Sequence, residues 1–323
     1  MTQRGNLDLI IARLPALKKR QRVRLCQKFS REEDFLCLSY RDILCETGAQ
    51  AEFDVGIPLW NIDEVRRQAE RDRQLMEARN IQIVSISEEQ YPPLLREIYD
   101  PPAVLFYRGD FTGAFCAKKM LAVVGTRKPS SEALELCYCI TLELGQAGIS
   151  VVSGMALGID AMAHRGNCDG GGATIAVLGS AADMIYPSAN RQLAQRILER
   201  GGVLLSEYPP GTPPQRWHFP ERNRIISGLC SATLVVEAPR KSGALITADF
   251  ALEHDRDLWV AAGVEGPLGD GCLALADDGA KIVHSAEDVL LEWGIPPRKS
   301  TAQLSLAANL ARELELDDLS SLL

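Results

Sequence analysis

The 323-residue sequence lacks the marks of several common classes of protein. It has no run of about 18 apolar residues, so a membrane-spanning helix is not expected. Its first residues hold no compact apolar block with a small-residue cleavage site, so no signal peptide is expected. The nine cysteines are odd in number and form no Cys-x-x-Cys pair, which disfavours structural zinc. Such a pattern is typical of reduced thiols in a cytosolic protein. With only four histidines, no metal site or cofactor is expected.

The charge of the chain is uneven. A net charge of −8 argues against nucleic acid only superficially, because residues 1–30 contain eight lysines and arginines and a single acid, Asp8. Residues 31–110 are acidic by contrast. A local basic patch can attract a polyanion whatever the net charge. The basic run from Leu17 to Leu25 is also a plausible solvated helix surface, so both interpretations stay open.

The apolar pattern divides the chain into three parts. Residues 1–80 have the helical spacing of a small helical domain. Residues 81–292 alternate short apolar runs with helical stretches, which indicates a parallel sheet covered by helices on both faces. We therefore predict an α/β protein with an extended Rossmann-like, doubly wound, mostly parallel sheet. Residues 293–323 are expected to be a linker and a short helical tail, with no room for a full winged-helix domain. The strands are expected at 81–86, 104–107, 120–124, 150–152, 174–178, 203–206, 232–236 and 258–261.

Polar, glycine-bearing loops follow several of these strands. In such a sheet, ligands lie beyond the carboxyl ends of the strands, where helix N-termini present their amides. The first loop, 125–130, matches neither a dinucleotide-binding nor a Walker A motif, so NAD binding and ATP hydrolysis are not supported. Similar loops at 153–158, 208–219 and 237–247 add glycines and cations. Four such loops at one edge predict an anion-binding rim.

The segment from His218 to Gly228 carries two arginines around Asn223. The guanidinium fork suits phosphate. If the segment is helical, Arg222 and Arg224 lie about 200° apart, so that one can face a ligand and the other a structural partner. Arg224 is the stronger candidate for direct contact. The aromatic residues Trp217 and Phe219 are candidates for base stacking or for packing over the sheet edge.

Acidic residues near the rim are candidates for structural support. Asp160 and His164 are four residues apart on one helical face, so they can form an acid–base pair or a structural hydrogen bond. The sequence places no serine or cysteine as their nucleophile. We therefore expect Asp160, His164 and Glu237 to support the site, with no catalytic residues and no enzymatic activity.

Five segments of the chain carry a recognisable pattern. They are Ser153-Gly-x-Ala-x-Gly-Ile-Asp-x-x-Ala-His164, Ile175-Ala-Val-Leu-Gly-Ser180, Leu205-Ser-Glu-Tyr-Pro-Pro-Gly-Thr-Pro-Pro214, His218-Phe-Pro-x-Arg-Asn-Arg-Ile-Ile-Ser-Gly228 and Ser242-Gly-x-Leu-Ile-Thr247. Together they closely resemble the DNA-processing protein A family, also called DprA or Smf, over roughly residues 80–290. The resemblance implies an extended Rossmann-like domain that binds single-stranded DNA, a cytoplasmic homodimer, and a recombination mediator. Such a mediator protects incoming DNA and loads the recombinase RecA during natural transformation.

The resemblance also implies which residues contact DNA. The basic contacts map onto Arg127, Arg222, Arg224 and Lys241. Leu157 stands where family members often carry a basic residue. The N-terminal helices resemble only weakly the sterile-alpha-motif-like domain of some members. The full set of candidate phosphate-binding residues is Gly125, Thr126, Arg127, Ser153, Gly154, Gly158, Arg222, Asn223, Arg224, Lys241, Ser242, Gly243 and Thr247.

Two other functions use the same rim. Related Rossmann-like folds include phosphoribohydrolases, in which Glu237 or Asp160 would act on a glycosidic bond. The Pro-Gly-Gly-x-Gly-Thr motif of those enzymes does not occur here. A sensor of small nucleotides is the third interpretation. A comparison of the binding affinities for mononucleotides and oligonucleotides separates it from DNA binding.

Overall fold

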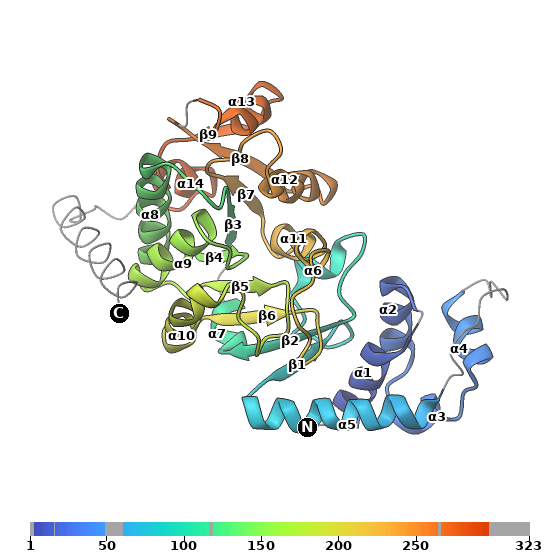
Figure 1. Cartoon of the computed structure of the whole chain (residues 1–323). Coiled ribbons are helices and arrows are strands. Elements are labelled where there is room, and N and C mark those ends of the chain that lie inside the picture. The colour runs from blue at the N-terminus through green and yellow to red at the C-terminus, as the bar shows by residue number, and fades with distance from the viewer. Residues whose placement is uncertain (1–2, 16, 49–60, 116–118, 264–265, 297–323) are drawn as a thin grey trace. The chain divides into compact units, whose positions relative to one another are not determined.

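The protein is described here from a computed structural model of the whole chain (Figure 1). Residues Met1–Ala286 form one compact unit and Glu287–Leu323 form a second. The predicted linker and tail, 293–323, lie mostly outside the described residues. The division of the first unit into two domains at residue 80 stays a prediction. The structure describes residues 3–15, 17–48, 61–115, 119–263 and 266–296.

Five helices precede the sheet. In the first of them the apolar residues at helical spacing, Leu7, Ile10 and Ile11, are all buried. The fourth begins with a capping box, in which Ser39 Oγ accepts a hydrogen bond from the Asp42 amide and the Asp42 carboxylate accepts one from the Ser39 amide. The helices are α1 (Gln3–Arg13), α2 (Lys19–Lys28), α3 (Glu32–Leu36), α4 (Tyr40–Thr47) and α5 (Ile62–Arg79).

These helices share a hydrophobic core with the sheet. α1 contacts the first strand, where the Ser85 hydroxyl donates a buried hydrogen bond of 3.0 Å to the Asp8 carboxylate. Asn80 ends α5 in the left-handed conformation, at φ 53°, and the chain turns into the sheet there. The acid Asp8, surrounded by cations in the sequence, is thus a structural residue.

A single nine-stranded sheet forms the centre of the first unit. β1 and β2, and β2 and β6, pair antiparallel, whereas all other neighbours are parallel. The strand order is β1-β2-β6-β5-β4-β3-β7-β8-β9. The prediction of a Rossmann-like, mostly parallel α/β fold is confirmed. The strands are β1 (Gln82–Ser85), β2 (Val104–Gly109), β3 (Met120–Val124), β4 (Ser150–Ser153), β5 (Ile175–Leu178), β6 (Val203–Ser206), β7 (Ala232–Val235), β8 (Asp257–Ala261) and β9 (Lys281–Val283).

Helices cover both faces of this sheet. Figure 1 shows α8, α9 and α10 on one side of the parallel strands and α11 and α12 on the other. All five residues of β3 are buried, as expected of a central strand between two helical layers. The remaining helices are α6 (Pro93–Glu97), α7 (Phe111–Phe115), α8 (Ser131–Gln146), α9 (Ile159–Asp169), α10 (Arg191–Glu199), α11 (His218–Gly228), α12 (Gly243–Glu253), α13 (Asp270–Asp277) and α14 (Ala286–Glu292), with a short 3₁₀ helix at Ser188–Asn190.

The order of the strands creates a switch point in the sheet. From β3 the chain proceeds in one direction to β4, β5 and β6, and then continues on the other side of β3 with β7, β8 and β9. The loops after β3 and β7 therefore diverge, which opens a crevice at the carboxyl ends of these two strands. The sequence did not predict β9, a three-residue edge strand whose Lys281 and Ile282 are exposed.

Candidate nucleic-acid interface

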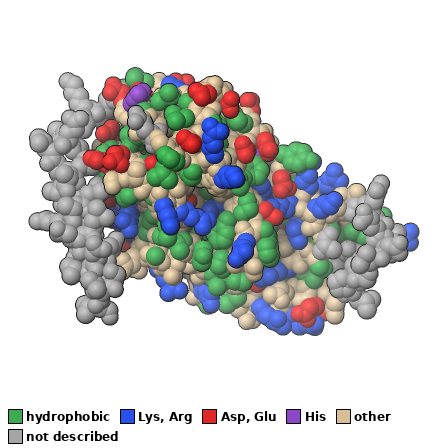
Figure 2. Space-filling view, turned by 45° about the horizontal axis from the view of Figure 1, so that its top comes forward, with side chains coloured by type: hydrophobic (Ala, Val, Ile, Leu, Met, Phe, Trp, Pro, Cys, Tyr) green, Lys and Arg blue, Asp and Glu red, His purple; other side chains and the backbone are tan. Residues whose placement is uncertain are grey.

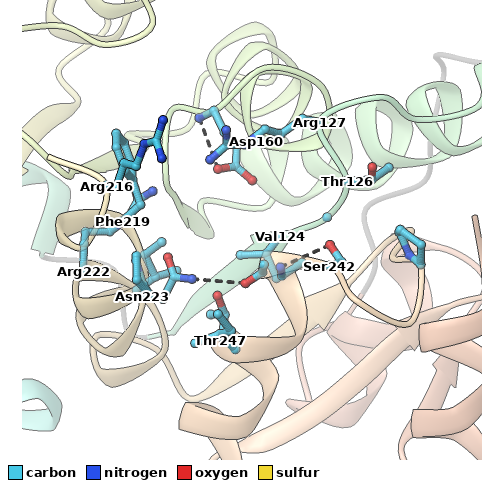
Figure 3. A pocket seen from close by; sticks show the side chains of 18 of the residues that line it. Val124, Thr126, Arg127, Asp160, Arg216, Phe219, Arg222, Asn223, Ser242 and Thr247 are labelled. Atoms are coloured by element: carbon cyan, nitrogen blue, oxygen red, sulfur yellow. Dashed lines mark hydrogen bonds between the residues drawn. The ribbon is translucent and has the colours of Figure 1, made fainter. Parts of the chain in front are cut away.

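A pocket of about 630 Å³ opens at this switch point (Figure 3). It lies between the loops that follow β3 and β7 and the helices α9, α11 and α12. Its volume falls in the range of ordinary ligand sites, roughly 300–1,000 Å³. The lining residues are Val124, Gly125, Thr126, Arg127, Ala156, Asp160, Tyr186, Arg216, Phe219, Pro220, Arg222, Asn223, Ile226, Pro239, Ser242, Gly243, Ala244, Ile246 and Thr247.

Ten of the residues predicted from the sequence come together here. Gly125, Thr126, Arg127, Asp160, Phe219, Arg222, Asn223, Ser242, Gly243 and Thr247 line the pocket. The predicted residues that do not line it are Ser153, Gly154, Gly158, His164, Trp217, Arg224, Glu237 and Lys241.

The pocket carries three arginines and one acid. Arg127 and Arg216 are exposed, whereas Arg222 and Asp160 are buried. Figure 3 shows Arg216 and Asp160 across the pocket from Thr247. On the face shown in Figure 2, lysine and arginine side chains gather near the middle among hydrophobic ones, while acidic side chains lie mainly toward the upper edge. The negative net charge is therefore compatible with a positive pocket.

Arg222 forms part of the pocket wall and also holds the neighbouring loops together. Its Nη1 donates to the backbone carbonyls of Gly154, at 2.6 Å, and Val177. These residues belong to the loop after β4 and to β5, so one guanidinium joins two adjacent strand ends. Burial lowers the pKa of Arg222 to about 10, which still leaves it charged at neutral pH. A Cβ at Gly154 would lie 2.4 Å from Nη1, so a larger residue there would displace the Arg222 guanidinium.

Arg224 lies on the other side of α11. Its Nη2 donates to Glu207 Oε1 at 2.6 Å and its Nε to Asp100 Oδ2 at 3.3 Å. Burial by itself lowers the pKa of Arg224, but the two carboxylates outweigh it and raise that pKa above the ordinary value. Direct contact of Arg224 with DNA stays a prediction, and in the structure it is Arg222 that faces the pocket instead.

The N-terminus of α12 opens onto the pocket. Ser242 caps it, with Oγ accepting from the Ala244 amide at 3.3 Å. Asn223 Nδ2 donates to the carbonyl of Gly243 at 3.2 Å, which ties α11 to this turn. Space is open around the Gly243 Cα, and Lys241 is exposed just before it. Open space at Gly243, a favourable helix dipole and a nearby cation make this turn a suitable seat for a phosphate.

The N-terminus of α8 is already filled by a carboxylate of the protein. Glu237 Oε2 accepts from the Ser130 amide at 2.8 Å, and Oε1 accepts from the Ser130 hydroxyl at 2.8 Å. The Glu237 carbonyl also accepts from the Thr126 amide at 2.7 Å. Glu237 therefore supports the loop after β3 rather than facing a ligand.

Asp160 and His164 serve separate contacts rather than pairing with each other. Asp160 accepts from the Ala156 amide at 3.2 Å, and burial raises the pKa of its carboxyl group despite the nearby Arg222. His164 Nδ1 bonds with the Thr174 hydroxyl at 2.7 Å. Burial lowers the pKa of His164 to about 3, so it is neutral at pH 7. Of the two interpretations of the i, i+4 spacing, the structure shows structural hydrogen bonds, made to other partners, and no acid–base pair between the two residues.

The remaining predicted residues hold the loops close together. Ser153 Oγ donates to the Val123 carbonyl at 2.6 Å, which links β4 to β3. Gly158 has φ 79°, and a Cβ there would lie 2.5 Å from the carbonyl oxygen of Thr126. A Cβ at Gly125 would meet Ile159 at 2.6 Å. These glycines are therefore needed for the close approach of the two loops.

Aromatic rings line the open side of the pocket. The Phe219 ring lies 5.6 Å from that of Tyr186, and the Arg127 guanidinium lies 5.9 Å from the Phe219 ring centre. Trp217 is 60% exposed beside the pocket. Exposed rings next to arginines are the usual elements of a platform for unpaired bases.

Nine lining residues were not predicted from the sequence, and two of them, Arg216 and Tyr186, bring a cation and an exposed ring to the pocket. Arg216 directly precedes Trp217 in the proline-rich loop, so its position was the available signal. Tyr186 comes from the segment after β5, whose strand end points to the same edge of the sheet.

In the part of the chain that the structure describes, no cluster of histidine, cysteine or carboxylate side chains could hold a metal ion. None of the described helices is long and apolar enough to span a membrane.

Residues 82–294 match the model of the family described as DNA recombination-mediator protein A. The chain is 44% identical to DNA processing protein DprA of Bacillus subtilis over 213 residues. This alignment covers 66% of the chain and 71% of the relative. Its structure is similar to the X-ray structure of DNA processing protein A from Streptococcus pneumoniae, with a TM-score of 0.72 and 34% identity over 90% of this chain and 98% of the other.

A second solved structure, DNA processing protein A from Helicobacter pylori, covers 66% of this chain and 95% of its own, with a TM-score of 0.60 and 27% identity. That structure was determined for its single-stranded DNA binding mode. The family match, residues 82–294, includes every residue that lines the pocket.

Proposed function

Because the chain belongs to the DNA recombination-mediator protein A family, we propose that it binds single-stranded DNA in the pocket at the β3–β7 switch point. The observation that supports this most is the combination of three arginines, an open helix N-terminus and exposed aromatic rings at one edge of the sheet. Arginine side chains and backbone amides bind the phosphates of a strand whatever its base sequence, and aromatic rings stack on any base. The site therefore suits a strand without sequence preference.

Each part of the pocket has a separate task in this proposal. Arg127 and Arg216 are exposed and neutralise phosphates, while Arg222 adds a fixed charge in the wall. The α12 turn at Ser242 and Gly243 offers a seat for one further phosphate oxygen. Phe219 separates or supports bases. Nothing in this arrangement activates a nucleophile, so we propose binding without a chemical step.

The wider role proposed for the chain follows from its family. We propose that it acts as a cytoplasmic homodimer that protects incoming single strands and loads RecA during natural transformation. A dimer would double the number of pockets along one strand and so raise the affinity through linkage of two sites. The measurement for this step is RecA filament formation on strands coated with single-strand-binding protein, with and without the chain.

A salt titration tests the binding proposal. If three arginines each neutralise one phosphate, log K falls with log salt at a slope of about −2 for a single strand, since each phosphate contributes about −0.7. Fluorescence anisotropy with an oligothymidylate measures this slope. Arg127→Gln should reduce its magnitude by about 0.7. Arg67→Gln is the matched control, because Arg67 is an exposed arginine of α5 that pairs only locally, with Glu64.

The alternative is a nucleotide-binding or phosphoribohydrolase-like enzyme. The buried Asp160 with its raised pKa is the one feature that favours it, because a general acid needs such a carboxyl group. The other candidate acid, Glu237, is occupied at the α8 N-terminus. Release of a free base from a nucleoside monophosphate, or mononucleotide binding as tight as oligonucleotide binding, would favour this alternative over the DNA-binding proposal.

A further inference from the structure

The basic run before the sheet contains cations that form no ion pair with a carboxylate of the described residues. α2 and its flanks hold Lys18, Arg20 and Arg24, all exposed, and none of the three forms an ion pair within the described residues. Arg20 donates to the Tyr99 carbonyl at 2.9 Å, and Arg24 donates to the Thr47 carbonyl at 2.6 Å. Their charges therefore remain available to a ligand.

The position of these charges on the helix is electrostatically unfavourable in isolation. Lys18 precedes α2 and Arg20 lies in its first turn, where the helix dipole is positive, and that turn contains no acid. Cations at this end of a helix are destabilising, whereas anions are favoured. A bound polyanion would relieve this repulsion.

An exposed aromatic ring lies beside the same charges. Tyr99 is 74% exposed, and the guanidinium of Arg20 stacks on its ring at 3.3 Å from the ring centre. A hollow of about 560 Å³ connects this pair with Lys18 and Arg24. Such a combination of cations and an open ring is typical of surfaces that bind single-stranded nucleic acid.

The acids near this surface are already paired. Asp100, Glu207 and Glu221 surround Lys19 Nζ at 3.0–3.9 Å, and Arg224 bonds to the first two of them. At the junction between α2 and α11, two cations therefore face three acids, a net charge of −1, which is smaller than the charge of the three cations Lys18, Arg20 and Arg24. The same helix α11 carries Phe219 and Arg222 into the pocket, so the surface begins on the opposite side of α11 from the pocket.

We propose that Lys18, Arg20, Arg24 and Tyr99, here called the α2–Tyr99 surface, form a second contact for the same single strand that occupies the pocket. This inference rests on the proposed function, and it assigns the basic run to DNA instead of to a merely solvated helix face. A strand that crosses α11 from the pocket meets this surface next. The strand must then be longer than one that fills the pocket alone.

The test compares strands of different length on one double variant. Lys18→Gln/Arg20→Gln is measured with oligothymidylates of about 4 to about 16 nucleotides, the range of site sizes of common single-strand-binding folds. We expect unchanged affinity for the shortest strand that the wild type binds. For the longest strand we expect a loss of about tenfold, with the salt slope reduced in magnitude by about 1.4. Arg66→Gln/Arg67→Gln on α5 is the control with the same change of charge.

Folding does not obscure this test, because the variant removes cations from the unfavourable end of a helix. The melting temperature should be unchanged or higher. A bromodeoxyuridine strand supplies a second measurement, since ultraviolet cross-linking should attach it to Tyr99 as well as to the pocket. Equal affinity of variant and wild type for every length, with cross-links at the pocket alone, would overturn the α2–Tyr99 surface and leave the pocket intact. Failure of the wild type to bind any strand would overturn the proposed function itself.

Discussion

Arg224 of α11 and Arg127 of the loop after β3 should respond to substitution in opposite ways. Arg224 is 5% exposed and bonds to Glu207, which is itself 13% exposed. Replacement of Arg224 by methionine fills most of its volume but removes the closer cation of the Glu207 carboxylate and leaves Lys19 Nζ at 3.8 Å. Removal of one member of a buried ion pair costs about 3–5 kcal/mol. For a unit of this size, 3 kcal/mol corresponds to a decrease of about 6–12 °C in the melting temperature.

The same variant should leave the ionic part of DNA binding unchanged. Arg224 does not line the pocket, so the salt slope for a short oligothymidylate should equal that of the wild type when measured well below the melting temperature. Arg127→Met is the matched comparison, because Arg127 is exposed and lines the pocket. The Arg127→Met variant should melt at the same temperature as the wild type, and the magnitude of its salt slope should be smaller by about 0.7. A stable Arg224→Met protein with a flattened slope would refute this assignment and restore Arg224 as a phosphate contact.

Three further outcomes follow from the same geometry. Gly154→Ala should lower the free energy of unfolding by about 1–3 kcal/mol in denaturant titrations, because its Cβ would displace the Arg222 guanidinium; a neutral effect would show that Arg222 moves freely. Phe219→Ala should weaken binding of a short oligothymidylate by about 1–3 kcal/mol in anisotropy, with an unchanged salt slope; a changed slope would mean that the ring acts through Arg127. Unfolding at several pH values should show stability falling as the pH decreases from about 6.5 toward about 3, because the folded state keeps His164 neutral while the unfolded state takes up a proton. His164→Gln should remove up to about 1.4 kcal/mol per pH unit of that dependence, and an identical profile would exclude His164 as its source.

The strands and the position of the site could be predicted from the sequence. A central strand such as β3 is a continuous apolar run, because helices cover both of its faces, and such a run is visible without a structure. The edge strand β9 has only one neighbour and exposes two of its three residues, so it lacks this signal. Loops at the carboxyl ends of parallel strands lie at one edge of the sheet by topology, which is why the loops after β3 and β7 could be placed at the same edge from the sequence.

The roles of individual side chains could not be predicted in the same way. Arg222 and Arg224 have the same chemistry and adjacent positions, and only the rotation of α11 decides which one faces the pocket. The partners of Arg224, Asp100 and Glu207, lie 124 and 17 residues away in the sequence. Likewise, spacing alone allows a pair between Asp160 and His164, but Thr174 competes for the histidine from another part of the chain.

The carboxylate of Glu237 at the start of α8 has a consequence for how firmly a strand is held. By filling that helix terminus itself, the protein leaves the α12 turn as the open helix terminus of the pocket. Few phosphates of the strand then bind to the pocket at one time. A slope of about −2 for log K against log salt implies that a fourfold rise in salt concentration lowers the affinity only about 16-fold. A strand held by few ionic contacts can be passed to another protein segment by segment, without one large barrier to release.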